Sequence, residues 1–465
     1  MKRTGFRLAG IGGLLVVGVF ATIARLPAEP IGDTSPAAPA ESAESKAPAG
    51  APDGKAAEGV AAVNPKIAEA VAQFKDHNFE NALKLLKEAG EQDPDMPPAQ
   101  VIMAQLFAQA NIAGGVRAFL DKAAFEVADD PEAFVYLGDM AARERRITEA
   151  DLLYEKAAGL LDKFTKSPKR KESLQPRICG GMAGVAQARE DWAAAQKHLE
   201  ALLALDPKSV AAMQKIAFCL FQQKRMDEAL EKLRDAAKAV PDMLIPELML
   251  AKFYQQTGDR ENAKKWMETA LAASPKDIRI HLAIAQSAFD FGDLDAAKAE
   301  AEAALKIDTK SLEAKVLRGT IAMFQKDSKT AEMYLDSAHL QAPNEFSAGN
   351  GLALTLVEQK DEAKKRKALQ YAEENVRKFS QTPEALATYG WVLYKLGRVD
   401  EAENALRSAA SAGNLTPATA FYLARVAVDR GRDADAKQLL DGALGASGPF
   451  AQRAEAQALL EQLKK

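Results

Sequence analysis

The sequence has few of the residues from which disulfide-rich proteins and metalloenzymes build their sites. Its 465 residues include two cysteines and four histidines, too few for a disulfide framework and little material for a metal site. The histidines are scattered, and no H-E-x-x-H, G-x-S-x-G or phosphate-binding loop motif is present. The sequence therefore predicts no catalytic, cofactor-binding or metal-binding residue, and we expect the protein not to be an enzyme.

Aromatic residues are also scarce, at 6% of a chain whose hydrophobic fraction is 48%. Much of the apolar content is therefore small, chiefly alanine, which is the best helix former, and β-branched residues are sparse after residue 63. This composition favours an all-α protein. The formal net charge is −4, so no global field attracts nucleic acid and no nucleic-acid partner is expected.

The N-terminal stretch 1–25 has the pattern of a membrane-targeting segment. Lys2, Arg3 and Arg7 precede the run 8–24, which contains no charged residue. The length of this run is at the lower limit for a spanning helix, so we expect an uncleaved single-pass anchor in an inner membrane. A signal peptide cleaved near Ala24 is the alternative, and a buried helix of a soluble domain is a third interpretation. Both membrane interpretations place the rest of the chain on the periplasmic, extracytoplasmic side.

Four segments are expected along the chain. Residues 26–62 are rich in Ala and Pro with little apolar bulk, which predicts a disordered linker. A repeat array is expected over 63–450, and a C-terminal capping helix over 451–465. The first of the four segments is the signal anchor or signal peptide, 1–25, which precedes this linker.

The array is predicted from a sequence period of about 34 residues. Eight of the ten steps between successive units have this same length; the units begin at Val63, Pro97, Pro131, Pro176, Val210, Leu244, Ile278, Leu312, Phe346, Pro383 and Pro417. Position 8 of each unit is Ala or Gly, and positions 20 and 27 are nearly always Ala. Positions 20 and 27 share one helix face, so small residues there let two antiparallel helices approach closely.

Other positions of the unit fit the same helical hairpin. Position 24 is usually leucine or an aromatic residue, which fills the space between units. Position 15 is glycine in four units, at Gly258, Gly292, Gly397 and Gly431, where it ends the first helix. Proline at position 32 of several units ends the second helix.

This pattern resembles the tetratricopeptide repeat (TPR) family over residues 63–450. The resemblance implies a superhelical solenoid of about eleven helical hairpins, and a concave face, lined by the first helices, that binds peptides or proteins. Two units depart from the pattern: Val116 stands at position 20 of unit 2 and Asn375 at position 27 of unit 9. The family's tryptophan at position 4 is absent.

Two insertions interrupt the period, and both are basic. Unit 4 is preceded by eleven extra residues, 165–175, with Lys166, Lys169, Arg170 and Lys171; unit 9 gains three residues, placed in its turn, near Lys360, Lys364, Lys365, Arg366 and Lys367. We expect solvated turns at both insertions; the alternative is a contact point for an anionic polymer, lipid or acidic partner.

The two cysteines lie on first helices of neighbouring units. Cys179 is at position 4 and Cys219 at position 10, which separates them by about 9 Å along the helix axis. A disulfide needs Cα atoms within roughly 7 Å. We therefore expect two buried thiols.

The resemblance also implies where a partner binds. The family turns positions near 2, 5, 9, 12 and 13 of the first helix toward the concave face. In units 5–8 the candidate partner-binding residues are Gln214, Phe218, Phe221, Leu248, Lys252, Gln255, Leu282, Gln286, Phe289, Val316 and Met323.

From these patterns we expect a bacterial, membrane-tethered, extracytoplasmic scaffold. It would bind peptide segments or proteins of an envelope assembly, secretion or polysaccharide export system through its groove, and bind the membrane through residues 8–24. A structural or self-associating spacer array without a peptide ligand is one alternative. An enzyme with unrecognised chemistry is the other.

Overall fold

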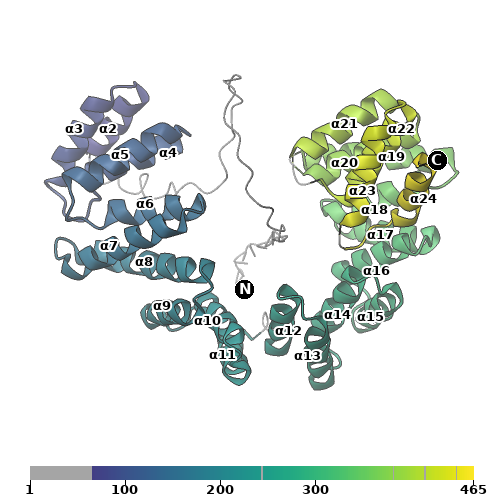
Figure 1. Ribbon diagram of the computed structural model, residues 1–465, viewed down its shortest axis with the longest axis horizontal. Coiled ribbons are helices and arrows are strands. Elements are labelled where there is room, and N and C mark those ends of the chain that lie inside the picture. The colour runs from purple at the N-terminus through teal and green to yellow at the C-terminus, as the bar shows by residue number, and fades with distance from the viewer. Residues whose placement is uncertain (1–64, 242–244, 381, 413–414, 447, 465) are drawn as a thin grey trace, which may run out of the picture. The chain divides into compact units, whose positions relative to one another are not determined.

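A computed structural model describes residues 65–241, 245–380, 382–412, 415–446 and 448–464. These residues form 23 α-helices and no strand (Figure 1), which confirms the all-α class. Among them, no helix is long and apolar enough to cross a membrane. The predicted membrane segment (8–24) and linker (26–62) lie outside the described residues.

Twenty-two of the described helices form eleven consecutive hairpins, one for each predicted unit. The first helices are α2 (Pro65–Lys75), α4 (Ala99–Gln109), α6 (Glu132–Arg143), α8 (Pro168–Ala188), α10 (Val210–Gln222), α12 (Pro246–Gln256), α14 (Ile278–Asp290), α16 (Leu312–Phe324), α18 (Phe346–Val357), α20 (Pro383–Lys395) and α22 (Pro417–Asp429). The second helices are α3 (Phe79–Gly90), α5 (Ala113–Glu126), α7 (Ile147–Lys163), α9 (Trp192–Leu205), α11 (Met226–Ala239), α13 (Arg260–Ala273), α15 (Leu294–Ile307), α17 (Ser328–Gln341), α19 (Glu362–Lys378), α21 (Val399–Ala412) and α23 (Asp433–Gly445).

A last helix, α24 (Arg453–Leu463), follows the eleventh hairpin. It buries Ala456, Leu459 and Leu460 in the same core as α22 and α23. An ion pair of 3.1 Å between Lys326 Nζ and Glu455 Oε1 brings α24 beside the turn of unit 8.

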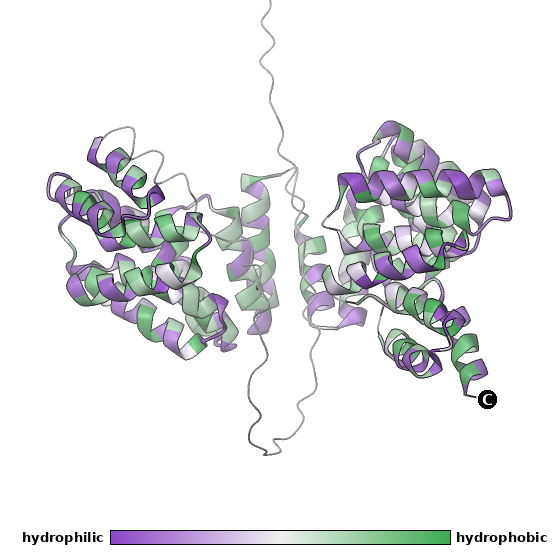
Figure 2. Cartoon of the chain, turned by 90° about the horizontal axis from the view of Figure 1, so that it is seen from above, coloured by the Kyte–Doolittle hydropathy of each residue, from purple (hydrophilic) through white to green (hydrophobic). Residues whose placement is uncertain are grey.

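The small residues of the period hold the hairpins together. In unit 5, Ala217, Ala229 and Ala236, at positions 8, 20 and 27, have no exposed surface, and Leu233 at position 24 is equally buried. Hydrophilic and hydrophobic residues alternate along the helices (Figure 2), as expected for helices that bury one side. The predicted packing role of these positions is confirmed.

Two glycines make room for an unusually large residue at position 24. Tyr154 occupies position 24 of unit 3, where most units have leucine. A Cβ added at Gly138 would lie 2.9 Å from the Tyr154 ring, and one added at Gly181 would lie 2.3 Å from it. Both distances are too short for a carbon contact, so the two glycines make room for this ring.

The turns between the two helices share a left-handed residue at position 15. The predicted glycines have φ of 69° to 80° there. Six other units place a side chain in the same conformation, with φ of 58° to 65°: His77, Asn111, Arg145, Glu190, Lys224 and Lys326. The backbone conformation is therefore common to ten of the eleven turns, whereas the sequence signal appears in only four.

The next residue, at position 16, immediately precedes the second helix. Asn78, Asp191, Asp259, Asp293 and Asp327 each cap this helix, because the side chain accepts a hydrogen bond from the backbone N–H three residues later. Units 3, 5, 10 and 11 have an arginine there instead. Arg225 pairs with Glu228, and Arg398 with Glu401, three residues further along the helix.

The first insertion is not a solvated turn, so that expectation was wrong. Helix α8 already begins at Pro168 and continues through Pro176, where the unit was expected to start. Ser167 caps the helix and also donates a hydrogen bond of 2.5 Å to Asp95 Oδ1. Arg170 is buried, and its guanidinium binds Asp130 at 2.8 Å and Glu132 at 2.6 Å. The insertion therefore binds residues of units 1, 2 and 3.

The second insertion lengthens a helix rather than the turn. Helix α19 has 17 residues, whereas α17 and α21 on either side have 14. Its cations pair with acids of the same chain: Lys364 with Glu332 at 2.6 Å and Lys367 with Asp336 at 3.8 Å.

Candidate binding face

The predicted binding residues lie on four consecutive first helices, α10, α12, α14 and α16. Side chains connect each helix to the next. The rings of Phe218 and Phe253 are 5.1 Å apart, Gln255 Nε2 donates to Ser287 Oγ at 2.8 Å, and the rings of Phe289 and Phe324 are 4.7 Å apart. The four helices therefore present their equivalent positions in one row.

Three of the predicted residues belong to the core. Phe221, Leu282 and Phe289 are 2%, 6% and 7% exposed, so they offer a ligand almost no surface. The Phe221 ring lies 4.7 Å from that of Tyr254 and 5.6 Å from that of Phe253. An aromatic at position 12 was expected to face a partner; in these units it fills the space between successive first helices.

The other eight predicted residues retain solvent-accessible surface. We call them the central face: Gln214, Phe218, Leu248, Lys252, Gln255, Gln286, Val316 and Met323. Lys252 and Gln286 are exposed, and the remaining six are half-buried. The face thus combines aliphatic and aromatic surface with amide side chains. Whether a partner binds here stays a prediction.

The sequence reasoning missed one charged neighbour of this face. Gln286 Nε2 donates a hydrogen bond of 2.8 Å to Asp290 Oδ1, one turn further along α14. Nearby atoms desolvate this carboxyl and raise its pKa, although the hydrogen bond opposes the shift. Its position 13 is one of those that the resemblance assigned to the binding face, and could have identified it.

The first helices before the central face carry a closed polar network. Asp139 on α6 accepts hydrogen bonds from Tyr154 at 2.6 Å and from Arg177 on α8 at 2.7 Å. The Arg177 guanidinium also stacks 4.2 Å from the centre of the Tyr136 ring, whose hydroxyl accepts a bond from Gln105 on α4 at 2.8 Å. These groups bind each other, so we assign them the role of stabilising units 2, 3 and 4.

On the first helices after the central face, two aromatic side chains are buried. Trp391 is 3% exposed and Phe421 is 2% exposed. Trp391 stacks on Tyr422 at 4.3 Å and donates from Nε1 to Glu358 at 2.8 Å, and the Phe421 ring lies 6.1 Å from that of Phe450. These two aromatic positions are therefore packed, whereas eight of the eleven predicted residues on α10 to α16 keep accessible surface.

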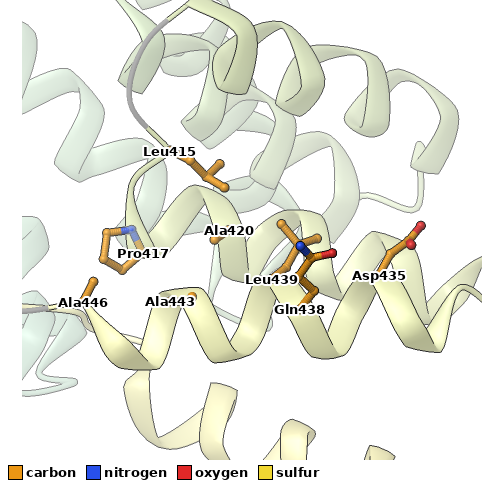
Figure 3. A pocket seen from close by; sticks show the side chains of 9 residues that line it. Leu415, Pro417, Ala420, Asp435, Gln438, Leu439, Ala443 and Ala446 are labelled. Atoms are coloured by element: carbon orange, nitrogen blue, oxygen red, sulfur yellow. The ribbon is translucent and has the colours of Figure 1, made fainter. Parts of the chain in front are cut away.

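A separate hollow of about 510 Å³ lies between α22 and α23 (Figure 3). Its walls are mostly apolar, with Leu415, Pro417 and Leu439 among them, and Asp435 and Gln438 at one end. It lacks the convergent polar groups that fix a small ligand, and we do not assign it a function.

The described residues offer no metal site of three or more His, Cys, Asp or Glu side chains. Both cysteines are free. Cys219 is buried as expected, whereas Cys179 is only partly buried, and burial raises the pKa of both thiols. A raised pKa disfavours the reactive thiolate.

The repeated hairpin and its row of first-helix side chains define an α-helical repeat protein. Family models described as tetratricopeptide repeat match residues 186–242 and 220–287, 278–311, and 387–451. Residues 186–311 and 387–451 are therefore tetratricopeptide repeats. No curated protein matches the chain.

Solved structures that are similar to this chain share little sequence with it. The yeast Tom70 structure is 14% identical, covers 88% of this chain and 96% of its own, and gives a TM-score of 0.37. Cut9–Hcn1 of the APC/C hetero-tetramer is 13% identical, with coverages of 88% and 92% and a TM-score of 0.42. A tetratricopeptide repeat protein from Parabacteroides merdae is 12% identical, with coverages of 63% and 100% and a TM-score of 0.38.

Proposed function

We propose that the protein is a protein-binding scaffold whose ligand lies on the central face. The observation that carries the proposal is the contrast along the first helices. Eight of the eleven predicted residues on α10 to α16 are half-buried or exposed, whereas the aromatic residues Trp391 on α20 and Phe421 on α22 are buried. Repeat proteins of this type use an extended row of such positions as a binding surface.

The chemistry of the central face fits an extended peptide segment. Phe218, Leu248 and Met323 can cover apolar side chains of a guest, and this burial would supply most of the affinity. Gln214 and Gln286 carry amides that can both donate and accept, which matches the donors and acceptors of a peptide backbone.

The proposed tether is the uncharged run 8–24 behind Lys2, Arg3 and Arg7. Positive charges before such a run favour the orientation that places the array on the extracytoplasmic side. The scaffold would then act in envelope assembly, secretion or polysaccharide export. This predicts a membrane-bound protein whose mass includes residues 1–24, and whose array is digested by protease added outside the inner membrane. A soluble form that begins near Arg25 would identify a signal peptide, and protection from protease would reverse the orientation.

A peptide selection tests the binding face. Random peptides displayed on phage are selected on the detergent-solubilised full-length protein, and the affinity of the selected peptides is measured for variants. Leu248→Ala with Met323→Ala should weaken binding about thirtyfold, since interface hot spots contribute about 2 kcal/mol or more. Lys264→Ala with Lys265→Ala, on the exposed side of α13, is the matched control and should leave affinity unchanged.

Melting temperature separates binding from folding in this experiment. The Leu248 and Met323 variants should melt close to the unchanged protein, whereas Phe221→Ala should be destabilised by about 3–5 kcal/mol because it leaves a core cavity. Full affinity in the Leu248 and Met323 variants would refute the central face. Light scattering that shows a concentration-dependent polymer instead would favour the self-associating spacer.

A further inference from the structure

Buried polar atoms without a hydrogen-bond partner are concentrated in two neighbouring units. Five of the six such side-chain atoms in the described residues belong to helices α16–α19: Arg318 Nη1, His339 Nδ1, Asn350 Oδ1, Thr355 Oγ1 and Asn375 Nδ2. Unit 9, formed by α18 and α19, holds three of them. None of these atoms has a hydrogen-bond partner among the protein atoms, and a buried polar group without a protein partner adds less to the stability of the folded state than a paired one.

Asn375 replaces the alanine that most units have at position 27. It is 6% exposed and lies between α18 and α19. A Cβ added at Gly349 would be 3.1 Å from Asn375 Oδ1, so this glycine accommodates the larger side chain. Thr355, which is 3% exposed, adds a second buried polar group on α18.

The local sequence of unit 9 is also weakly helical. Helix α18 contains Gly349 and Gly351 together with Asn350, and these residue types have low helix propensity. Unit 9 is the one unit whose described turn lacks a left-handed residue at position 15. Ala372 stands where α17 and α21 have Leu335 and Leu406 between helices. Local propensity, turn and packing all depart from the pattern in the same unit.

We propose that unit 9 is a conformational hinge, which opens locally while the units on either side stay folded. Local opening lets water reach the unpartnered groups, so these groups lower the free energy of opening in this unit more than in its neighbours. The hinge would allow units 10 and 11 to reorient relative to unit 8. This inference does not depend on the proposed peptide-binding function.

Hydrogen–deuterium exchange of the full-length protein, followed by mass spectrometry, tests the hinge. Peptides from α18 and α19 should exchange at least tenfold faster than those from α16, α17, α20 and α21. Asn375→Ala restores the alanine of position 27, Gly349→Ala raises the helix propensity of α18, and the two together should slow exchange in unit 9 about tenfold. Thr355→Val, which removes an unpartnered hydroxyl at nearly constant volume, should act in the same direction.

Thr419→Val is the matched control. Thr419 is 5% exposed, and its hydroxyl has a partner, Thr416 Oγ1, at 2.8 Å. Its replacement should therefore fail to slow exchange in α22. Equal exchange rates in units 8, 9 and 10 would overturn the hinge. It would also be overturned if unit 9 exchanged as rapidly in the Gly349→Ala/Asn375→Ala and Thr355→Val variants as in the unchanged protein.

Discussion

The six side chains held in a left-handed turn provide a quantitative test of the repeat. Arg145, Glu190 and Lys224 stand at position 15 of three consecutive units, with φ of 58°, 59° and 65°. The next unit has Gly258 there, with φ of 80°. Replacement of the three side chains by glycine should stabilise the protein, and Gly258→Lys should destabilise it.

The magnitude follows from two opposing effects on folding. A left-handed backbone costs an L-residue about 1–2 kcal/mol, because Cβ approaches a carbonyl oxygen. Glycine removes that cost but increases the conformational freedom of the unfolded chain, which offsets about 0.4–1 kcal/mol. The three side chains are exposed, so little packing is lost. The net gain should be about 0.5–1 kcal/mol for each site, or about 1.5–3 kcal/mol for the triple variant if distant sites add.

Guanidinium unfolding followed by circular dichroism measures this change, with the unchanged protein and each variant in the same detergent. Asn111→Gly is the control, because asparagine tolerates the left-handed conformation and its φ is already 58°; it should gain little. The triple variant could instead lose as much free energy of unfolding as Gly258→Lys does. That result would refute the reasoning, because it would show that the three side chains make contacts that outweigh the backbone strain.

Three further changes test the packing and the charges. Ala263→Leu should cost about 1–3 kcal/mol in thermal unfolding, since the 1% exposed Ala263 has no room for added atoms. Arg170→Met should cost about 3–5 kcal/mol, because it leaves Asp130 and Glu132 buried without their cation; retained stability would show that water replaces it. Burial lowers the pKa of His198 below its ordinary value of 6.5. The folded state therefore binds fewer protons, so its stability should fall as pH drops from about 7 to 5, and His198→Gln should reduce that slope.

The sequence period predicted the fold because steric contact between the two helices of each hairpin fixes which positions must be small. Ala229 and Ala236 can be recognised without a structure, since a larger residue would separate the two helices at either position. The left-handed turn was recognised only at glycine. At Glu190 and Lys224 the same conformation is imposed by the two helices that the turn connects, and a local sequence signal is absent where tertiary structure offsets the strain.

The candidate face was predicted less well, because position in the repeat does not determine exposure. Phe218 and Phe221 are one turn apart on α10, yet Phe218 is half-buried and Phe221 is 2% exposed. The Phe253 ring on the next first helix lies near both rings, but Tyr254 of the same helix lies 4.7 Å from Phe221 and covers that ring in addition. Exposure of an aromatic therefore depends on the residues of the following unit as well as on its own register.

The basic insertions show the same dependence for charge. Lys166 and Arg170 are close in sequence, and a charge count makes both appear available to an acidic partner. Lys166 pairs with Asp129 at the surface, whereas Arg170 is enclosed with Asp130 and Glu132. The acids that neutralise this insertion lie at the end of unit 2 and the start of unit 3, 40 residues away in the case of Asp130. A run of cations in a repeat protein therefore indicates a ligand site only if the acids of neighbouring units do not already pair with those cations.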